Sequence, residues 1–188
     1  MKTHEARAIA DRITAGIHFP GGAGGGWHAV AAEAAGTRWY SDLLSRIAIL
    51  VGTERVEYAS GYVDTDGGVH GEIVVLTGST IIRADFSTVR TPASALLSLD
   101  ATVAATSRST IASVSVTSVT AIGDEADEDW PRQVGAVVTT DDGRTFRLPL
   151  IKREASFPET DTAAIISSLL RHQPLRRGSA RLLPAAPR

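Results

Sequence analysis

The most informative stretch of the chain is GEIVVLTGSTIIRADF, which runs from Gly71 to Phe86. It holds two apolar, mostly β-branched runs, 73–76 and 81–82, on either side of Thr77-Gly78-Ser79. Two such runs around a small glycine-containing turn are typical of a β-hairpin. The first run is continuously apolar rather than alternating, so we expect at least part of it to be covered on both faces of a sheet.

Further strand signals lie on both sides of this hairpin, as runs in which apolar residues alternate with polar ones. The predicted strands outside the hairpin are residues 55–63, 95–105, 111–122, 134–140 and 144–150. The last two flank Asp141-Asp142-Gly143, the strongest hairpin turn in the chain. The run 111–122 is nearly devoid of charge, as a strand inside a sheet often is. Together these signals predict about seven antiparallel strands.

Apolar residues at spacings of three and four predict helices at both ends of the chain. The N-terminal candidates are residues 2–17, 27–35 and 37–51, and a C-terminal candidate ends near His172. The glycine-rich segment 19–26 lacks the Lys-Ser/Thr of a phosphate-binding loop and follows no strand, so we interpret it as a linker rather than a phosphate site. Ser156 and Glu159 have capping-box spacing before the last helix.

Composition limits the classes of function. The 188 residues are 43% hydrophobic and 21% charged, which is ordinary for a globular protein, and the net charge of −2 creates no field that attracts nucleic acid or membranes. The absence of cysteine excludes disulfides, thiolate nucleophiles and cysteine-bound metals. The N-terminus has no export pattern and the apolar run 47–51 is too short to cross a bilayer. We therefore expect a soluble, cytoplasmic protein.

No catalytic, cofactor-binding or metal-binding motif stands out. The five histidines are scattered without metal-ligand spacing, and no Gly-x-Ser-x-Gly elbow occurs. His70 and Glu72 lie near Asp64 and Asp66, but a solvated turn explains this group better than a metal site does. The acidic run 124–129 is either a cation or basic-partner site or, as we favour, a solvated loop. These observations predict a protein without enzymatic activity and without a cofactor.

The C-terminal residues form a basic, proline-punctuated tail without acidic residues. We expect it to be disordered. Its arginines suit anionic lipid, nucleic acid or an acidic protein surface, and charged tails also act simply by solubilising a protein. The tail arginines that we predict to bind a partner are Arg176, Arg177 and Arg181.

The order of these elements resembles the pleckstrin-homology superfold in its bacterial PH-like form. The matching stretches are GEIVVLTGSTIIRADF, then TIASVSVTSVTAI at the place of that family's middle strands, then VVTTDDGRTFRLPL before the last helix. The resemblance covers roughly residues 53–172 and implies a bent antiparallel sheet or barrel with a helix closing one open end. The family's lipid site needs clustered Lys and Arg in the first hairpin, whereas Arg55 is the only one between residues 55 and 73.

The sequence thus predicts an α+β fold: an antiparallel bent sheet or PH-like barrel of about seven strands, capped by a C-terminal helix and preceded by N-terminal helices. The expected organisation is N-terminal helices with a linker in 1–52, the PH-like domain in 53–172 and the basic tail in 173–188. We predict a non-enzymatic protein-interaction or assembly module with a protein or homo-oligomeric partner. The alternatives are peripheral binding to anionic membranes through the tail, and an enzyme of unrecognised type.

The apolar face of 37–51 is the second predicted partner-binding feature. Trp39, Leu43 and Ile47 are spaced by four residues and form a wide apolar stripe. Such a stripe needs a covering surface, which is either the chain's own sheet or another chain.

Overall fold

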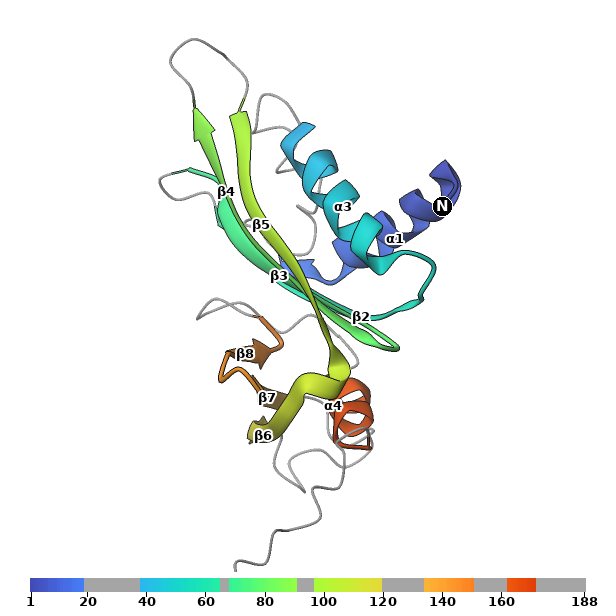
Figure 1. Ribbon diagram of the computed structural model, residues 1–188. Coiled ribbons are helices and arrows are strands. Elements are labelled where there is room, and N and C mark those ends of the chain that lie inside the picture. The colour runs from blue at the N-terminus through green and yellow to red at the C-terminus, as the bar shows by residue number, and fades with distance from the viewer. Residues whose placement is uncertain (19–37, 65–67, 91–96, 120–133, 151–161, 172–188) are drawn as a thin grey trace, which may run out of the picture.

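The computed structural model describes residues 1–18, 38–64, 68–90, 97–119, 134–150 and 162–171, and these form an α+β fold with two sheets and three α-helices (Figure 1). The first sheet, called the large sheet here, contains β1 (Ile17–His18), β2 (Val56–Asp64), β3 (His70–Thr77), β4 (Thr80–Arg90) and β5 (Leu97–Ser107) in that order. The small sheet contains β6 (Ile111–Val119), β7 (Val134–Thr140) and β8 (Thr145–Leu148). The helices are α1 (Thr3–Ala15), α3 (Arg38–Val51) and α4 (Thr162–Arg171), and the short 3-10 turn η1 (Arg108–Thr110) joins the sheets.

The predicted hairpin is confirmed as β3 and β4 at the centre of the large sheet. The two strands are antiparallel, with Leu76 opposite Ile81 beside the turn. Residues 73–76 are completely buried, and alternate ones belong to different cores: Ile73 and Val75 to the first, Val74 and Leu76 to the second. Successive strand residues point to opposite faces. The continuous apolar run therefore has the predicted cause, since both faces of the large sheet are covered here.

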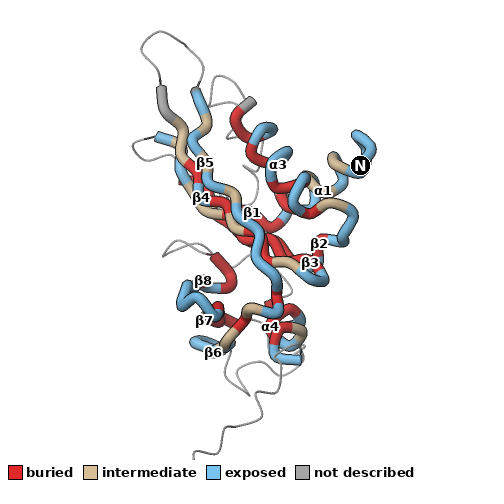
Figure 2. Tube along the Cα trace, in the orientation of Figure 1, coloured by how far each residue is buried: buried red, intermediate tan, exposed pale blue. Residues whose placement is uncertain are grey.

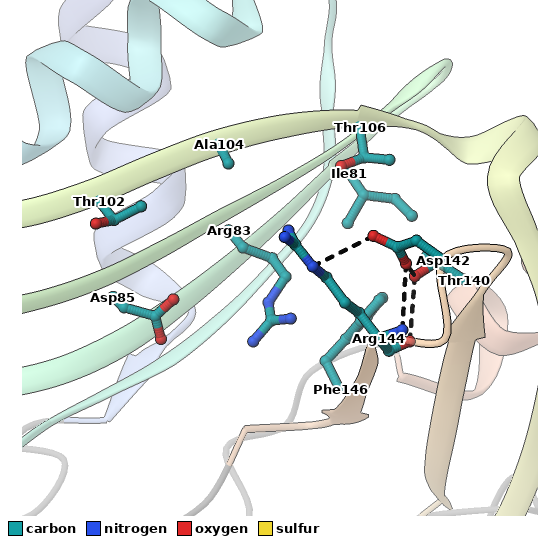
Figure 3. A pocket seen from close by; sticks show the side chains of 10 residues that line it. All are labelled: Ile81, Arg83, Asp85, Thr102, Ala104, Thr106, Thr140, Asp142, Arg144 and Phe146. Atoms are coloured by element: carbon teal, nitrogen blue, oxygen red, sulfur yellow. Dashed lines mark hydrogen bonds and ion pairs between the residues drawn. The ribbon is translucent and has the colours of Figure 1, made fainter.

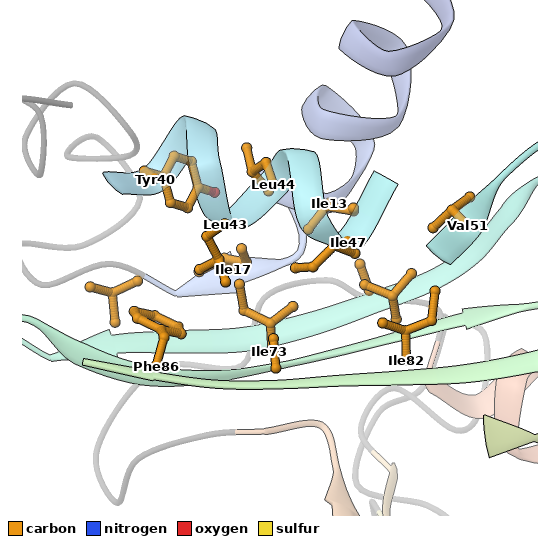
Figure 4. Packing of buried hydrophobic residues seen from close by; sticks show 14 of the residues in the cluster. Ile13, Ile17, Tyr40, Leu43, Leu44, Ile47, Val51, Ile73, Ile82 and Phe86 are labelled. Carbon is orange, nitrogen blue, oxygen red and sulfur yellow. The ribbon is translucent and has the colours of Figure 1, made fainter. Parts of the chain in front are cut away.

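The first core lies between the large sheet and the two N-terminal helices (Figure 4). The ring of Trp39 on α3 stacks on Phe86 of β4, with ring centroids 5.7 Å apart. Tyr40 of the same helix shares a hydrogen bond of 2.9 Å with the hydroxyl of Thr14 on α1, which joins the two helices. Because β1 pairs in parallel with β2, the chain that leaves α1 also becomes part of the large sheet.

The turn between α1 and β1 brings backbone very close to β2. A Cβ atom at Gly16 would collide with the carbonyl oxygen of Ala59. Only glycine permits this approach of two backbones. The N-terminal helices are therefore attached to the large sheet through backbone contact as well as through apolar side chains.

The second core lies on the opposite face of the large sheet, between that sheet and the layer formed by the small sheet and α4 (Figures 1 and 2). The helix buries Ile165, Ile166 and Leu169 in this core. At its first residue, the hydroxyl of Thr162 lies 3.3 Å from that of Tyr58 on β2. The amphipathic pattern of the C-terminal helix thus reflects packing on both sheets.

The structure agrees with the predicted elements and differs in how they are joined. All seven predicted antiparallel strands are present as β2 to β8, and the predicted helices 2–17 and 37–51 and the C-terminal helix are present as α1, α3 and α4. Among the described residues the strands form two separate sheets rather than a closed barrel. The predicted helix 27–35 and the capping pair at Ser156 and Glu159 lie outside the described residues.

One strand prediction is wrong in its place within the sheet. The uncharged run from Ile111 was expected to lie inside a sheet, yet within the part of the chain that the structure describes β6 pairs only with β7 and is an edge strand. The lack of charge therefore does not reflect a central position in the sheet. It leaves an edge strand without the charges that normally block pairing with a further strand.

Candidate interaction surface

The α3 residues predicted to bind a partner lie in the first core. Trp39, Leu43 and Ile47 are at most 1% exposed. Leu43 and Ile47 point toward the large sheet (Figure 4), and Trp39 stacks on Phe86 of that sheet. The chain's own sheet is thus the surface that covers this stripe. The exposed apolar residues of the helix are instead Ile49 and Leu50, with exposed fractions of 71% and 38%.

The other predicted partner-binding residues, Arg176, Arg177 and Arg181, lie outside the described residues, as does the acidic run 124–129. Binding of anionic membranes through the tail therefore stays a prediction. In the part of the chain that the structure describes, no helix has the length and apolar character needed to cross a bilayer.

Of the residues that suggested a loose metal site, His70 and Asp64 lie beside each other. Nε2 of His70 lies 3.5 Å from the Asp64 carboxylate. Glu72 is engaged elsewhere, because Arg83 on β4 donates to it across 2.8 Å. Asp66 lies outside the described residues. Among the described side chains, no group of three His, Asp or Glu residues is placed to hold a metal ion.

An open groove separates the edge of the large sheet from the β7–β8 hairpin (Figure 3). It has a volume of about 90 Å³. The lining residues are Ile81, Arg83, Asp85, Thr102, Ala104, Thr106, Thr140, Asp142, Arg144 and Phe146. The groove therefore combines an apolar floor with threonine hydroxyls and side chains of both charges.

Most charged groups of the groove are already paired with a neighbour. Arg83 forms the ion pair with Glu72 and lies over the ring of Phe146, 5.7 Å from the centroid. The Asp142 carboxylate accepts hydrogen bonds from the hydroxyl of Thr140 at 2.5 Å and from the backbone N–H of Arg144 at 3.2 Å, and it forms an ion pair with Nε of Arg144 at 3.2 Å. The bond from Thr140, followed by that from the backbone N–H of Arg144, lowers the pKa of Asp142. These pairs stabilise the turn and leave little charge for a ligand.

Arg108 in η1 is a buried cation that the sequence analysis did not single out. Its Nη1 donates to the Glu57 carboxylate and to the carbonyl of Thr77, both at 2.7 Å, and its Nη2 donates to Ser168 of α4 at 3.2 Å. The side chain is only 4% exposed. It therefore connects β2, the β3–β4 turn and α4, and we assign it a structural role. An isolated Arg within a run of Ser and Thr gave no periodic signal.

The edges of the two sheets differ in how far they are protected. The edge strands β1 and β8 have two and four residues, and the chain after β8 continues into Pro149. On β5 the guanidinium of Arg46 binds the carbonyl of Ala101 across 3.2 Å, and the neighbouring Asp100 adds an exposed charge. Short length, proline and charge are the usual means by which proteins block further strand pairing.

The strand β6 has none of these three protections. It is nine residues long and contains no charge and no proline, and among the described residues it pairs on one side only. Its pairing with β7 has register shifts near residue 112 and residue 117, so only the central residues 113–116 are regular. The N–H and C=O groups on the outer side of this segment can pair with an added strand.

Apolar side chains accompany this open edge. Val114, Val116 and Val119 lie opposite Val138, Ala136 and Val134 of β7, whose side chains are buried in the second core. Directly opposite residues of an antiparallel pair share a face, so the three valines lie on the inner face of the small sheet. Val116 and Val119 are nevertheless 52% and 49% exposed, and Leu170 on α4 is 45% exposed. We call residues 113–119 the β6 surface.

Comparison with known proteins identifies no relative of this chain. The chain matches no protein-family model, and neither curated proteins nor solved structures give a match. The functional argument therefore rests on the described residues.

Proposed function

We propose that this chain is a non-enzymatic protein-interaction module of the pleckstrin-homology type, which binds its partner by adding a strand to the edge of β6. The order of elements supports the class. A four-stranded antiparallel meander, β2 to β5, is followed by the three-stranded meander β6 to β8 and then by α4, which packs against both sheets. This is the order that the sequence resemblance implies for a PH-like fold.

The observation that carries the binding mode is the uncharged open edge of β6 with its half-exposed valines. An extended segment that pairs with a sheet edge gains affinity from main-chain hydrogen bonds and specificity from the side chains beside the edge. A partner strand along residues 113–116 would satisfy the outer backbone groups and would cover Val116. Burying this apolar surface favours association by about 25 cal/mol for each Å² removed from water.

A structural role explains the charged pairs of the groove better than catalysis does. Among the described residues that line it, Arg83 is held by Glu72, and Asp142 is held by Thr140 and Arg144. A general acid or base needs a group that is free to exchange a proton with a substrate. We therefore propose a structural role for these pairs and place the function at the β6 surface.

A selection of random peptides on the full chain tests the proposal. We expect enriched peptides with extended, β-branched sequences that slow hydrogen exchange of the β6 amides when bound. Val116→Lys should weaken their binding at least tenfold, because it places a charge in the covered surface. Ile49→Lys is the matched control, since it makes the same kind of change at a 71% exposed apolar residue on α3. Peptides that bind both variants equally, or that leave β6 exchange unchanged, would refute strand addition.

A further inference from the structure

We infer that the partner of the β6 edge is a second copy of this chain, whose β6 pairs antiparallel with the first across a twofold axis at Ser115. This inference rests on the proposed function and specifies the occupant of the same surface. It makes a continuous six-stranded sheet from the two small sheets, with the order β8-β7-β6 in one copy continuing as β6-β7-β8 in the other.

The absence of charge in β6 favours a copy of the same chain. Near a twofold axis every residue faces itself or a close sequence neighbour, so a charged strand would oppose like charges, which is destabilising. Residues 111–119 contain only Ile, Ala, Ser, Val and Thr. The edge strand β5 differs, because it carries Asp100 and its Ala101 carbonyl is bound by Arg46. Of the two long edge strands that the structure describes, β6 is therefore the one suited to self-pairing.

The positions of the valines are consistent with this register. A twofold axis perpendicular to the sheet keeps the same face of both copies on the same side. With the axis at Ser115, Val114 of one copy lies opposite Val116 of the other, and opposite residues share a face. Val114 is partly buried against the second core, whereas Val116 is 52% exposed. Each copy would thus place a core-packed valine beside the exposed valine of its partner.

On the outer face, the same register brings hydroxyl side chains together. Ser115 faces its own copy, and Ser113 faces the partner at the end of its regular segment, near Thr117. Cross-strand pairs of Ser and Thr form favourable hydrogen bonds without needing an opposite charge. Both faces of the segment are therefore compatible with self-pairing in one register.

The register shifts in β6 limit the size of this interface. Regular pairing is confined to about residues 113–116, between the irregularities near residues 112 and 117. A contact of this length buries less surface than the ~1,600 Å² of a standard protein interface. We therefore expect a weak, reversible dimer whose fraction rises with protein concentration over the range from about 1 μM to about 1 mM.

Light scattering coupled to size-exclusion chromatography tests this inference with a charge exchange at the axis. The wild-type chain should approach twice its mass of 19.8 kDa at the highest concentration. Ser115→Lys and Ser115→Glu should each stay monomeric, because two like charges would face each other. An equimolar mixture of the two should dimerise again. Thr102→Lys, at an exposed position of β5, is the matched control and should dimerise like the wild type.

A cysteine variant provides a second measurement that does not depend on charge. The chain has no cysteine, so Ser115→Cys introduces a single thiol. Directly opposite strand residues have Cβ atoms about 4.5–5.5 Å apart, close to the separation that a disulfide needs. Mild oxidation should therefore give a covalent dimer at least tenfold faster than it does with Thr102→Cys. Thermal unfolding of each variant shows whether it has folded.

Three results would overturn the second-copy inference. They are a wild-type monomer over the whole concentration range, dimerisation of Ser115→Lys as strong as that of the wild type, and equal oxidation rates of the two cysteine variants. A monomer whose β6 amides exchange slowly would mean that another part of the same chain covers the edge, which also overturns it. A monomer that binds selected peptides at β6 would exclude the second copy while supporting strand addition.

Discussion

Nη1 of Arg108 lies 2.7 Å from the carboxylate of Glu57, and this ion pair connects the turn between the two sheets to β2. The two partners differ in environment, because the arginine side chain is 4% exposed and the glutamate side chain 39%. Arg108 also binds the buried carbonyl of Thr77. Because Arg108 also donates to Ser168, this one buried cation holds β2, the β3–β4 turn and α4 in their relative positions.

Replacement of this arginine should destabilise the fold markedly. Arg108→Met keeps apolar bulk but removes every donor, which leaves the Thr77 carbonyl unpaired in a buried place. The free energy of unfolding should fall by at least about 2 kcal/mol, as expected for an unsatisfied buried group and lost charged hydrogen bonds. Urea denaturation measures this. Arg144→Met is the control, because Arg144 is 72% exposed and an exposed ion pair such as the one with Asp142 contributes little to stability. Similar losses in both variants would contradict the assigned role.

Truncation of one buried and one exposed side chain on α3 should reduce the free energy of unfolding by different amounts. Leu43→Ala removes a fully buried side chain and should reduce the free energy of unfolding by about 2–5 kcal/mol. Ile49→Ala changes an exposed side chain and should cost about 0.5 kcal/mol or less. Chemical denaturation of the purified chain checks both values. A small loss for Leu43→Ala would mean that the helix does not contribute to the core in solution.

The carboxyl of Glu54 should titrate below its ordinary pKa of 4.5. It accepts a hydrogen bond of 2.6 Å from the hydroxyl of Ser79, which is the main cause of the lowered pKa, and further bonds come from Thr77 and the Ser79 backbone. The folded state therefore binds this proton less tightly than the unfolded state does. Ionised Glu54 stabilises the fold above the unfolded-state pKa, and this contribution is lost as the pH falls through the folded-state pKa.

A carboxyl NMR titration of Ser79→Ala tests this assignment. The pKa of Glu54 should rise toward 4.5 when the hydroxyl is removed. Asp142 in the β7–β8 turn should keep its lowered pKa, because its partners are Thr140 and Arg144. An unchanged Glu54 titration would show that the hydrogen bond to Ser79 does not control this group.

Addition of one methyl group at the end of α1 should loosen the N-terminal helix. In Gly16→Ala the new Cβ would collide with the Ala59 carbonyl of β2, so the two backbones must separate. Overpacking of this kind typically costs about 1–3 kcal/mol. Hydrogen exchange of the α1 amides should accelerate accordingly. Gly78→Ala is the control, because its Cβ would meet nothing closer than carboxylate oxygens at 3.8 Å. Equal effects at the two sites would contradict the close approach.

Local pattern predicted the strands β2 to β8 and the helices α1, α3 and α4, but not the short parallel strand β1. The double-sided burial of 73–76 was readable because a continuous apolar run has no polar face to expose. The candidate site was much less predictable. Trp39, Leu43 and Ile47 indicated a stripe that needs a cover, but periodicity carries no information about whether that cover belongs to the same chain or to another.

The sequence by itself determined the register of apolar residues, and with it which face of each helix and strand is buried. Only the tertiary structure decided what covers each face and which strands lie at an edge, because these depend on contacts between residues far apart in the chain. The stripe on α3 lies against β4 and β5, while the uncharged β6 has a neighbouring strand on one side only among the described residues. Arg108 shows the same limit, since its partners Glu57 and Ser168 are 51 and 60 residues away along the chain.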